Sequence, residues 1–216
     1  VVKHKHEENE HNDYLKEVLL PHENSRLGPG IATGDIDGDN LDDFIVGGAK
    51  DQPTAFYFQK LDGSFSKKSF SFSKSHSKYE DMDIMLKDFD SDGDLDVYIV
   101  SGGNEFEQNS PILKDRLYTN NGNGSLIYNE DSLPNNFSSG MRLSSADYDK
   151  DGDIDLFVGG RVVPGNYPLP ADSFLLVNTS NKNGIKFINA SEIDFPFKDI
   201  GFVTSSVWTD YNNDSW

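Results

Sequence analysis

The 216-residue chain contains no cysteine, which excludes a disulfide framework and any metal site or nucleophile that depends on a thiolate. Basic residues are scarce, since 19 Lys and Arg stand against 37 Asp and Glu and the formal net charge is −18. Nucleic-acid-binding proteins present a basic face, so this balance argues against nucleic acid as a partner. No apolar run approaches the ~18 residues of a membrane-spanning helix, and we expect no membrane-spanning segment.

Helical periodicity and catalytic spacing are also lacking. The only helical feature that we expect is a single turn around Asp13–Leu19. Ser, His and Asp occur without the spacing that couples them in a triad, so the sequence predicts no enzyme active site. Four of the five histidines lie near the N-terminus. The pair His4 and His6 could chelate a metal, but a solvated tail or strand is the favoured interpretation.

One acidic nonapeptide recurs three times in the chain. It reads DIDGDNLDD at Asp35–Asp43, DFDSDGDLD at Asp88–Asp96 and DYDKDGDID at Asp147–Asp155. Each copy runs into a short apolar segment that ends in Gly-Gly. A fourth copy begins at Asp210 and is incomplete at Trp216.

Each full copy predicts a calcium site. Carboxylates at positions 1, 3, 5 and 9 and the backbone carbonyl of position 7 make an all-oxygen shell, which favours Ca²⁺ over Mg²⁺ in a flexible loop. Position 6 requires a positive φ, which Gly adopts freely and Asn tolerates; it is Asn40, Gly93 and Gly152. The expected ligands are Asp35, Asp37, Asp39, Leu41 and Asp43; Asp88, Asp90, Asp92, Asp94 and Asp96; Asp147, Asp149, Asp151, Asp153 and Asp155; and, in a partial fourth site, Asp210, Asn212 and Asp214.

Two alternatives to this interpretation are weaker. Asp, Asn and Gly also mark solvated turns, but three copies with the same carboxylates and the same following strand do not fit that explanation. An EF-hand needs a Glu at position 12 followed by a helix. This chain has Val46, Ile99 and Val158 there, each inside an apolar run.

The spacing of the copies predicts the fold. Their first residues fall at 35, 88, 147 and 210, steps of 53, 59 and 63 residues, which are periods typical of arrays and propellers. Each period holds four strand-like segments, the last two joined by Gly/Asn hairpin turns. In the second and third periods we expect strands at Asp83–Leu86, Asp96–Ser101, Arg116–Asn120 and Leu126–Asn129, and at Met141–Ser145, Ile154–Val158, Phe174–Asn178 and Lys186–Ala190.

Four antiparallel strands per period make one propeller blade. We therefore predict an all-β chain, a β-propeller of four-stranded blades that begin near residues 31, 82, 141 and 202. Residues 1–30 are expected to form a lead-in in which Val1–Glu7 is the outer strand of a preceding blade, and residues 31–216 the repeats. Three and a fraction blades cannot close a ring, since propellers typically have four to eight blades, so we expect about three to four blades of a larger ring of seven or eight.

These motifs carry a family resemblance. Asp-x-Asp-x-Asp-Gly-x-x-Asp followed by an apolar strand and Gly-Gly resembles the FG-GAP/VCBS repeat, found in the calcium-bearing propeller of integrin α-subunits. The segments Leu19–Asp39, Ser101–Tyr118 and Leu156–Pro170 are similar to bacterial surface proteins of the ASPIC/UnbV-associated type. The resemblance spans roughly residues 19 to 216. Asn40 departs from the Gly of the motif, and Asn212 from its Asp at position 3.

The resemblance and the calcium loops together imply a location. Calcium sites of micromolar to millimolar affinity are filled outside cells and largely empty in the cytosol. We therefore expect an extracellular, outer-membrane-associated address at the surface of a bacterium in preference to the periplasm. Three bound Ca²⁺ would reduce the net charge from −18 to −12.

The loops after the Gly-Gly strands, at 47–54, 102–115 and 159–173, are expected on the face opposite the calcium loops. Function is often found in such loops. The residues that we expect to contact a partner are Asn104, Glu105, Phe106, Arg161 and Tyr167. The competing interpretation is that these loops only pack on the next blade.

Two functions remain open. The favoured one is a non-enzymatic interaction module that binds a protein or glycan at the cell surface, as part of a larger assembly such as an outer-membrane complex. The alternative is part of a calcium-dependent carbohydrate-active enzyme that resembles a polysaccharide lyase. A lyase needs a cluster of Lys, Arg or Tyr in the central funnel, where we expect only Lys50, Arg116 and Arg161.

Overall fold

The computed structural model describes residues 1–181, 184–190 and 197–213, and in these ranges the chain is an all-β protein with three four-stranded sheets. Within each sheet the strands are antiparallel and follow chain order. The strands are β1 (Ile31–Gly34), β2 (Asp43–Val46), β3 (Ala55–Gln59), β4 (Phe65–Lys68), β5 (Asp81–Lys87), β6 (Asp96–Ser101), β7 (Arg116–Thr119), β8 (Ile127–Tyr128), β9 (Ser139–Ala146), β10 (Asp155–Val162), β11 (Phe174–Asn178) and β12 (Phe187–Asn189).

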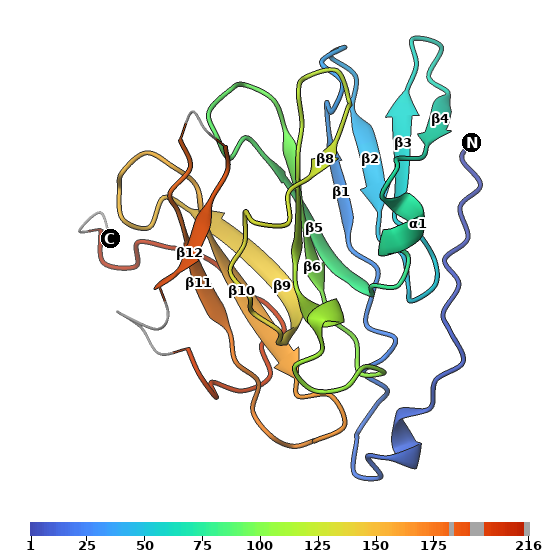
Figure 1. The fold of residues 1–216 in the computed structure, drawn as a ribbon, viewed down its shortest axis with the longest axis vertical. Coiled ribbons are helices and arrows are strands. Elements are labelled where there is room, and N and C mark those ends of the chain that lie inside the picture. Colours follow the sequence, from blue (N-terminus) through green and yellow to red (C-terminus); the bar gives the residue numbers. More distant parts are fainter. Residues whose placement is uncertain (182–183, 191–196, 214–216) are drawn as a thin grey trace.

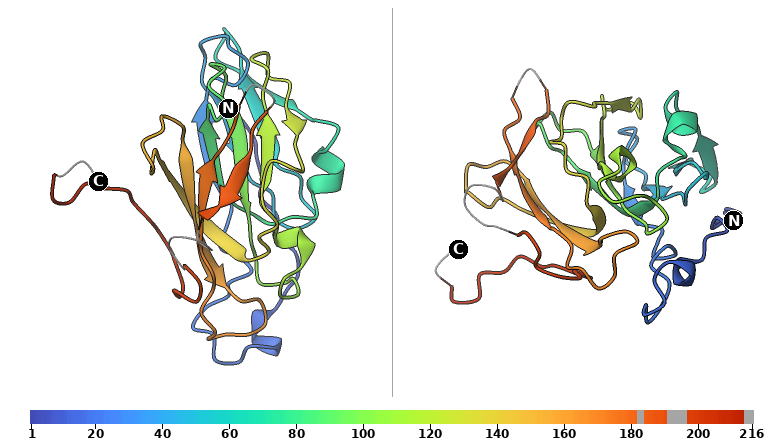
Figure 2. Two further views of the ribbon diagram at one scale, coloured as in Figure 1. Left: turned by 60° about the vertical axis from the view of Figure 1, so that its left-hand side comes forward. Right: turned by 60° about the horizontal axis from the view of Figure 1, so that its bottom comes forward.

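The three sheets stand side by side in chain order, as blades of a propeller do (Figures 1 and 2). The first strand of each sheet contacts the first strand of the next, β1 with β5 and β5 with β9. These strands are therefore innermost, and β4, β8 and β12 are the outer edges. The prediction of four-stranded antiparallel blades is confirmed.

The hydrophobic core lies between neighbouring sheets, and β6 shows why its sequence is apolar throughout. Successive side chains of a strand point to opposite faces. Val97 and Ile99 pack toward the first sheet, in a cluster with Ile45. Tyr98 and Val100 belong to the cluster shared with the third sheet. A strand buried on both faces reads as a continuous apolar run, which explains the motif that follows each acidic loop.

Helix is minor in the described residues. The expected turn near Asp13–Leu19 is a shorter 3-10 turn, Asp13–Leu15, whose start is capped by the Asn12 side chain accepting from the backbone N–H of Tyr14 at 3.0 Å. The structure adds a second 3-10 turn, η2 (Pro111–Leu113), and one short helix, α1 (Ser73–His76). Elements of three or four residues are too short to show periodicity in a sequence. Among the described residues no helix has the length and apolar character needed to cross a bilayer.

The structure has no strand at Val1–Glu7, where we expected the outer strand of a preceding blade. Residues 1–12 have no regular structure and run beside the first sheet (Figure 1). Side chains hold the segment there: the Gln52 amide donates to the carbonyl of Lys5 at 2.8 Å and accepts from the N–H of Glu7 at 3.3 Å. His4 bonds the Tyr57 hydroxyl at 2.9 Å. The segment is held by these side-chain contacts and forms no backbone ladder with the first sheet, which its sequence alone does not reveal.

The expected fourth blade near residue 202 is not matched by a strand within 202–213. This segment instead lies against the third sheet. The N–H of Val203 donates to the carbonyl of Gly160 at 2.9 Å, and the Ser206 and Ser144 hydroxyls are 2.8 Å apart.

Candidate metal loops and interaction face

The three complete acidic loops join the first and second strands of their sheets and lie at one end of the molecule, the upper end in Figure 1. In each loop three carboxylates offer oxygens within 4.8 Å of one another. The three sets are Asp35, Asp37 and Asp39; Asp88, Asp90 and Asp96; and Asp147, Asp149 and Asp155. Each copy of the repeat thus forms an acidic cluster that could hold a cation.

The loop backbone wraps around the carboxylate at position 1. Asp35 accepts the N–H groups of Gly38 and Asn40, both at 2.8 Å. In the second loop Asp88 accepts from Gly93 at 2.9 Å. Each loop therefore closes on its first Asp through backbone donors.

Position 6 has the positive φ that the sequence predicts, with values of 66° at Asn40, 96° at Gly93 and 99° at Gly152. Position 4 is also left-handed in every loop, which the sequence analysis missed. It is Gly38, Ser91 and Lys150, with φ of 76°, 61° and 62°. The incomplete fourth copy repeats this feature, since φ of Asn213 at its position 4 is 57°.

Position 3 supplies oxygens that have no hydrogen-bond partner. Oδ1 of Asp37 and Oδ1 of Asp90 are both buried and unpaired. Burial, followed by the neighbouring Asp39 carboxylate, raises the pKa of Asp37. Burial, followed by Asp92, does the same to the pKa of Asp90. An unpaired buried carboxylate oxygen beside other carboxylates fits a hard cation as its missing partner.

Position 9 is a buried hydrogen-bond acceptor in all three loops. Oδ2 of Asp96 accepts the N–H of Phe89 at 3.0 Å, and Oδ1 accepts the N–H of Asn120 at 2.9 Å. Asp43 and Asp155 make the equivalent pairs, with Ile36 and Gln59 and with Tyr148 and Asn178. Each position-9 Asp therefore ties the start of its loop to the end of the third strand.

An asparagine at the end of the third strand connects one blade to the loop of the blade before it, and the sequence analysis missed it. The side-chain amide of Asn120 donates to the carbonyl of Ile36 in the preceding loop at 2.7 Å. Asn178 donates likewise to the carbonyl of Phe89 at 2.9 Å. The recurrence of Asn 24 and 23 residues after the position-9 Asp was the available signal.

Some predicted ligands lie outside these clusters. Asp43, Asp92 and Asp151 do not belong to the sets of converging carboxylates. The predicted position-7 carbonyls come from Leu41, Asp94 and Asp153, whose N–H groups donate to the position-5 carboxylates at 2.9 Å in each loop. Asp210 and Asn212 lie in the C-terminal segment, and Asp214 is outside the described residues.

The loops that join second and third strands lie at the opposite end, the lower end in Figure 1, as expected. The predicted partner-contacting residues there pack largely on the chain itself. Asn104 is buried and its amide donates to Glu17, which also accepts the N–H of Tyr167 at 2.7 Å. Lys50 lies 5.4 Å from the centre of the Phe106 ring. Glu17, absent from the sequence analysis, thus fastens two loops to the N-terminal segment.

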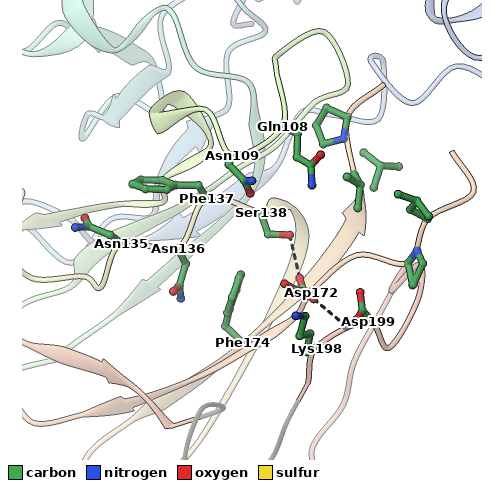
Figure 3. Close-up of a pocket in the computed structure, with 15 residues that line it drawn as sticks. Gln108, Asn109, Asn135, Asn136, Phe137, Ser138, Asp172, Phe174, Lys198 and Asp199 are labelled. Atoms are coloured by element: carbon green, nitrogen blue, oxygen red, sulfur yellow. Dashed lines mark hydrogen bonds between the residues drawn. The ribbon is translucent and has the colours of Figure 1, made fainter. Parts of the chain in front are cut away.

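A cavity of about 450 Å³ opens between the second- and third-sheet loops of this face (Figure 3). Its lining includes side-chain amides, with Phe137 and Phe174 as aromatic neighbours. The Ser138 hydroxyl donates to the carbonyl of Asp172 at 3.0 Å. The amides are those of Gln108, Asn109, Asn135 and Asn136. Amide and aromatic groups together can bind polar, non-ionic ligands or peptide backbone.

A smaller neighbouring cavity is lined by Arg161 and Tyr167, two of the predicted contact residues. Arg161 bonds His22 at 3.1 Å while its Nε remains buried and unpaired, and burial lowers the pKa of its guanidinium. Tyr167 stacks on Phe202 with ring centres 5.7 Å apart. Glu105, by contrast, lies in a separate cluster with Glu80.

The basic residues proposed for a catalytic funnel do not form a cluster of available groups. Arg116 is fully buried and its guanidinium donates to Asp81. Asp81 also accepts the N–H of Gly48 at 2.8 Å and the Thr54 hydroxyl at 2.6 Å. Arg116 is therefore part of a structural ion pair that holds β5 and β7 together.

Comparison with known families agrees with the repeat geometry. The family model for the FG-GAP-like repeat matches residues 35–99 and again residues 88–158. Each match begins at the first Asp of an acidic loop and runs into the following blade. No curated protein matches the chain.

Proposed function

Because the chain belongs to the FG-GAP-like repeat family, we propose that it is a calcium-stabilised, non-enzymatic module that binds a protein or glycan at a cell surface. FG-GAP repeats form β-propeller-like interaction modules, and their domains are generally non-enzymatic. The finer parts of the proposal concern the ion, the partner and the location. Each of these parts has its own test.

The calcium part rests on the unpaired oxygens of Asp37 and Asp90. Each is buried beside other carboxylates, and without a cation the cost of that burial has no offsetting interaction. These oxygens would coordinate a bound Ca²⁺, whose positive charge would offset the repulsion between the carboxylates of each loop. Folding and calcium binding should therefore be coupled.

Titration calorimetry on chelator-treated protein tests this part. We expect Ca²⁺ to bind with a stoichiometry of three for the complete loops and to raise the melting temperature, since a ligand at about 100 times its Kd stabilises by about 2.7 kcal/mol. Asp90→Asn should remove one equivalent, whereas Asp62→Asn, at an exposed hairpin aspartate, should remove none. An unchanged melting temperature with excess Ca²⁺ would contradict the proposal.

The interaction part rests on the face opposite the acidic loops. Its amide- and aromatic-lined cavity and the adjoining Arg161–Tyr167 cavity combine the residue types found at binding hot spots. Glu17 holds two of its loops in place, so little conformational entropy should be lost on binding. A protein or glycan partner is therefore the kind of ligand that we propose.

Replacing Arg161 and Tyr167 together by Ala should weaken capture of the partner without altering calcium stoichiometry. The matched control is Lys60→Ala with Leu61→Ala, two exposed residues at the outer hairpin of the first sheet. Equal capture by both double variants would mean that the loops only pack on the chain. The binding surface would then be sought on the outer strands.

The location part is an extracellular, outer-membrane-associated address of the ASPIC/UnbV type. It is supported by the calcium loops. Calcium dissociation constants between micromolar and millimolar would fit, because such sites fill outside cells. Submicromolar constants would contradict it. The alternative of a lyase is weaker, because the Arg116 guanidinium is buried in an ion pair with Asp81 and cannot contact a substrate.

A further inference from the structure

A second kind of acidic cluster lies at the start of β5, at the opposite end of that strand from its acidic loop. Glu80 directly precedes β5, while His6 and Glu8 come from the N-terminal segment. Nε2 of His6 is 2.8 Å from Oε1 of Glu8. One donor atom from each of the three side chains lies within 4.8 Å of the others. Glu105, from the loop after β6, adds a fourth side chain beside Glu80.

Unpaired buried atoms distinguish this cluster from a solvated acidic surface. Glu80 is fully buried, and its Oε2 accepts the N–H of Lys50 at 2.7 Å while its Oε1 has no partner. The same holds for Oε2 of Glu8, Oε1 of Glu105 and Nδ1 of His6, which are all buried without a hydrogen bond. Four such atoms from three separate parts of the chain indicate a missing common partner.

The charge of the cluster points the same way. Burial, followed by the charge of Glu105, raises the pKa of Glu80 to about 9. Burial also raises the pKa of Glu105. Within the described ranges no Lys or Arg forms an ion pair with Glu8, Glu80 or Glu105. Three carboxyl groups are therefore brought together in a poorly solvated place, where His11 and Lys50 act on Glu105 from nearby without forming an ion pair with it.

We propose that His6, Glu8 and Glu80, with Glu105, bind a divalent transition-metal cation of the Zn²⁺ or Mn²⁺ class. An imidazole nitrogen beside carboxylate oxygens suits such ions, whereas Ca²⁺ takes an all-oxygen shell like that of the acidic loops. The chain thus has two chemically different kinds of metal site at opposite ends of the second sheet.

The structure gives His4 and His6 different surroundings, although the sequence suggested both as possible metal ligands. His4 bonds the Tyr57 hydroxyl at 2.9 Å and is outside the cluster. The His6 side chain is 18% exposed, so it lies against the protein and is not part of a solvated tail. The metal would therefore fasten the irregular segment 1–12 to the second sheet.

The test is titration of chelator-treated protein with Zn²⁺ and, separately, with Mn²⁺, in excess Ca²⁺ that fills the acidic loops. We expect one equivalent of at least one of these ions to bind. His6→Ala and Glu80→Gln should each weaken the affinity by at least about tenfold. His4→Ala, the matched control, should bind as the wild type does, and so should Asp90→Asn, which removes a calcium ligand only.

Limited proteolysis gives a second readout that does not depend on calorimetry. The same ion should slow cleavage within residues 1–12 in the wild type and in His4→Ala, and should have no such effect in His6→Ala. If Glu80→Gln does not fold, Glu8→Gln replaces it, since Glu8 lies in a segment without regular structure. Binding of neither ion in excess Ca²⁺, or wild-type affinity in both His6→Ala and the Glu variant, would overturn the proposal.

Discussion

The position-9 aspartates are buried carboxyl groups that hold backbone donors in place. Asp43, Asp96 and Asp155 are at most 1% exposed, and each accepts one backbone N–H from its own loop and one from the end of the third strand. Burial raises the pKa of all three, that of Asp96 to about 7. In the absence of a cation the charged form of these residues therefore costs stability.

This cost predicts a pH dependence for the metal-free protein. The pKa of Asp96 in the folded state, about 7, lies above the unfolded value of about 4. Between these pH values the folded state binds more protons, so the contribution of Asp96 to stability is lost as pH rises. Denaturant titrations of chelator-treated protein at pH 4 to 7 should show a more negative slope of unfolding free energy in the wild type than in Asp96→Asn.

The comparison with the variant is needed because a histidine has the opposite effect. Burial lowers the pKa of His76 to about 4, so its contribution to stability increases as pH rises. His76 is unchanged in Asp96→Asn and cancels in the difference. Equal slopes in the two proteins would contradict the assignment of a raised pKa to Asp96.

At the scale of elements, the third strand of one blade supports the loop of the blade before it. The Asn120 amide, at the end of β7, donates to the carbonyls of Ile36 at 2.7 Å and Leu95 at 3.0 Å. Asn120 is 3% exposed, so both carbonyls lose their partner inside the protein if the amide is removed. The contact joins the acidic loops of the first and second sheets.

Asn120→Ala should therefore destabilise the protein by about 1–3 kcal/mol, the cost of leaving a buried polar group without a partner. Urea unfolding in excess Ca²⁺ measures this loss. Asn121→Ala is the control, since its side chain is exposed at the next position of the same turn. Equal unfolding free energies for the two variants would show that the amide of Asn120 makes no net contribution.

The elements were largely predictable because each blade strand has a local signal. The expected strand at Phe174–Asn178 is β11. The second strand of the third sheet was expected to end at Val158, but β10 continues to Val162, with irregular pairing to β9 around Gly159 and Gly160. The link from Asn120 to Ile36 was missed because its partners are 84 residues apart. The His6–Glu80 cluster was missed for the same reason, since burial and distant contacts decide the role of His6.

At the scale of the whole molecule, much of the negative charge behind the net −18 lies in the three acidic loops. Twelve aspartates, at positions 1, 3, 5 and 9 of the complete loops, lie at one end of the three sheets, which stand side by side. Their repulsion should destabilise the metal-free fold at long range as well as within each loop. Ions in solution screen such repulsion over about 10 Å at 0.1 M ionic strength.

We therefore expect NaCl to raise the melting temperature of the chelator-treated protein and to change that of the calcium-bound protein much less. Scanning calorimetry at ionic strengths from about 0.01 to about 0.1 M, across which the screening length falls threefold, checks this. Choline chloride should act like NaCl, because the effect depends on ionic strength and not on a specific ion. A fall in melting temperature with salt would contradict it.

The hydrogen bonds between loops have one more consequence, which is cooperativity. From Asp155 the contacts run through Asn178 and Phe89 to Asp96, and from Asp96 through Asn120 and Ile36 to Asp43. A cation that orders one loop thereby orders part of the next loop. The second ion then loses less conformational entropy on binding, because its site is already partly ordered. Coupling of this kind typically amounts to about 1–3 kcal/mol between sites. Calcium isotherms should be steeper than for independent sites, and Asn120→Ala together with Asn178→Ala should return them to independent binding.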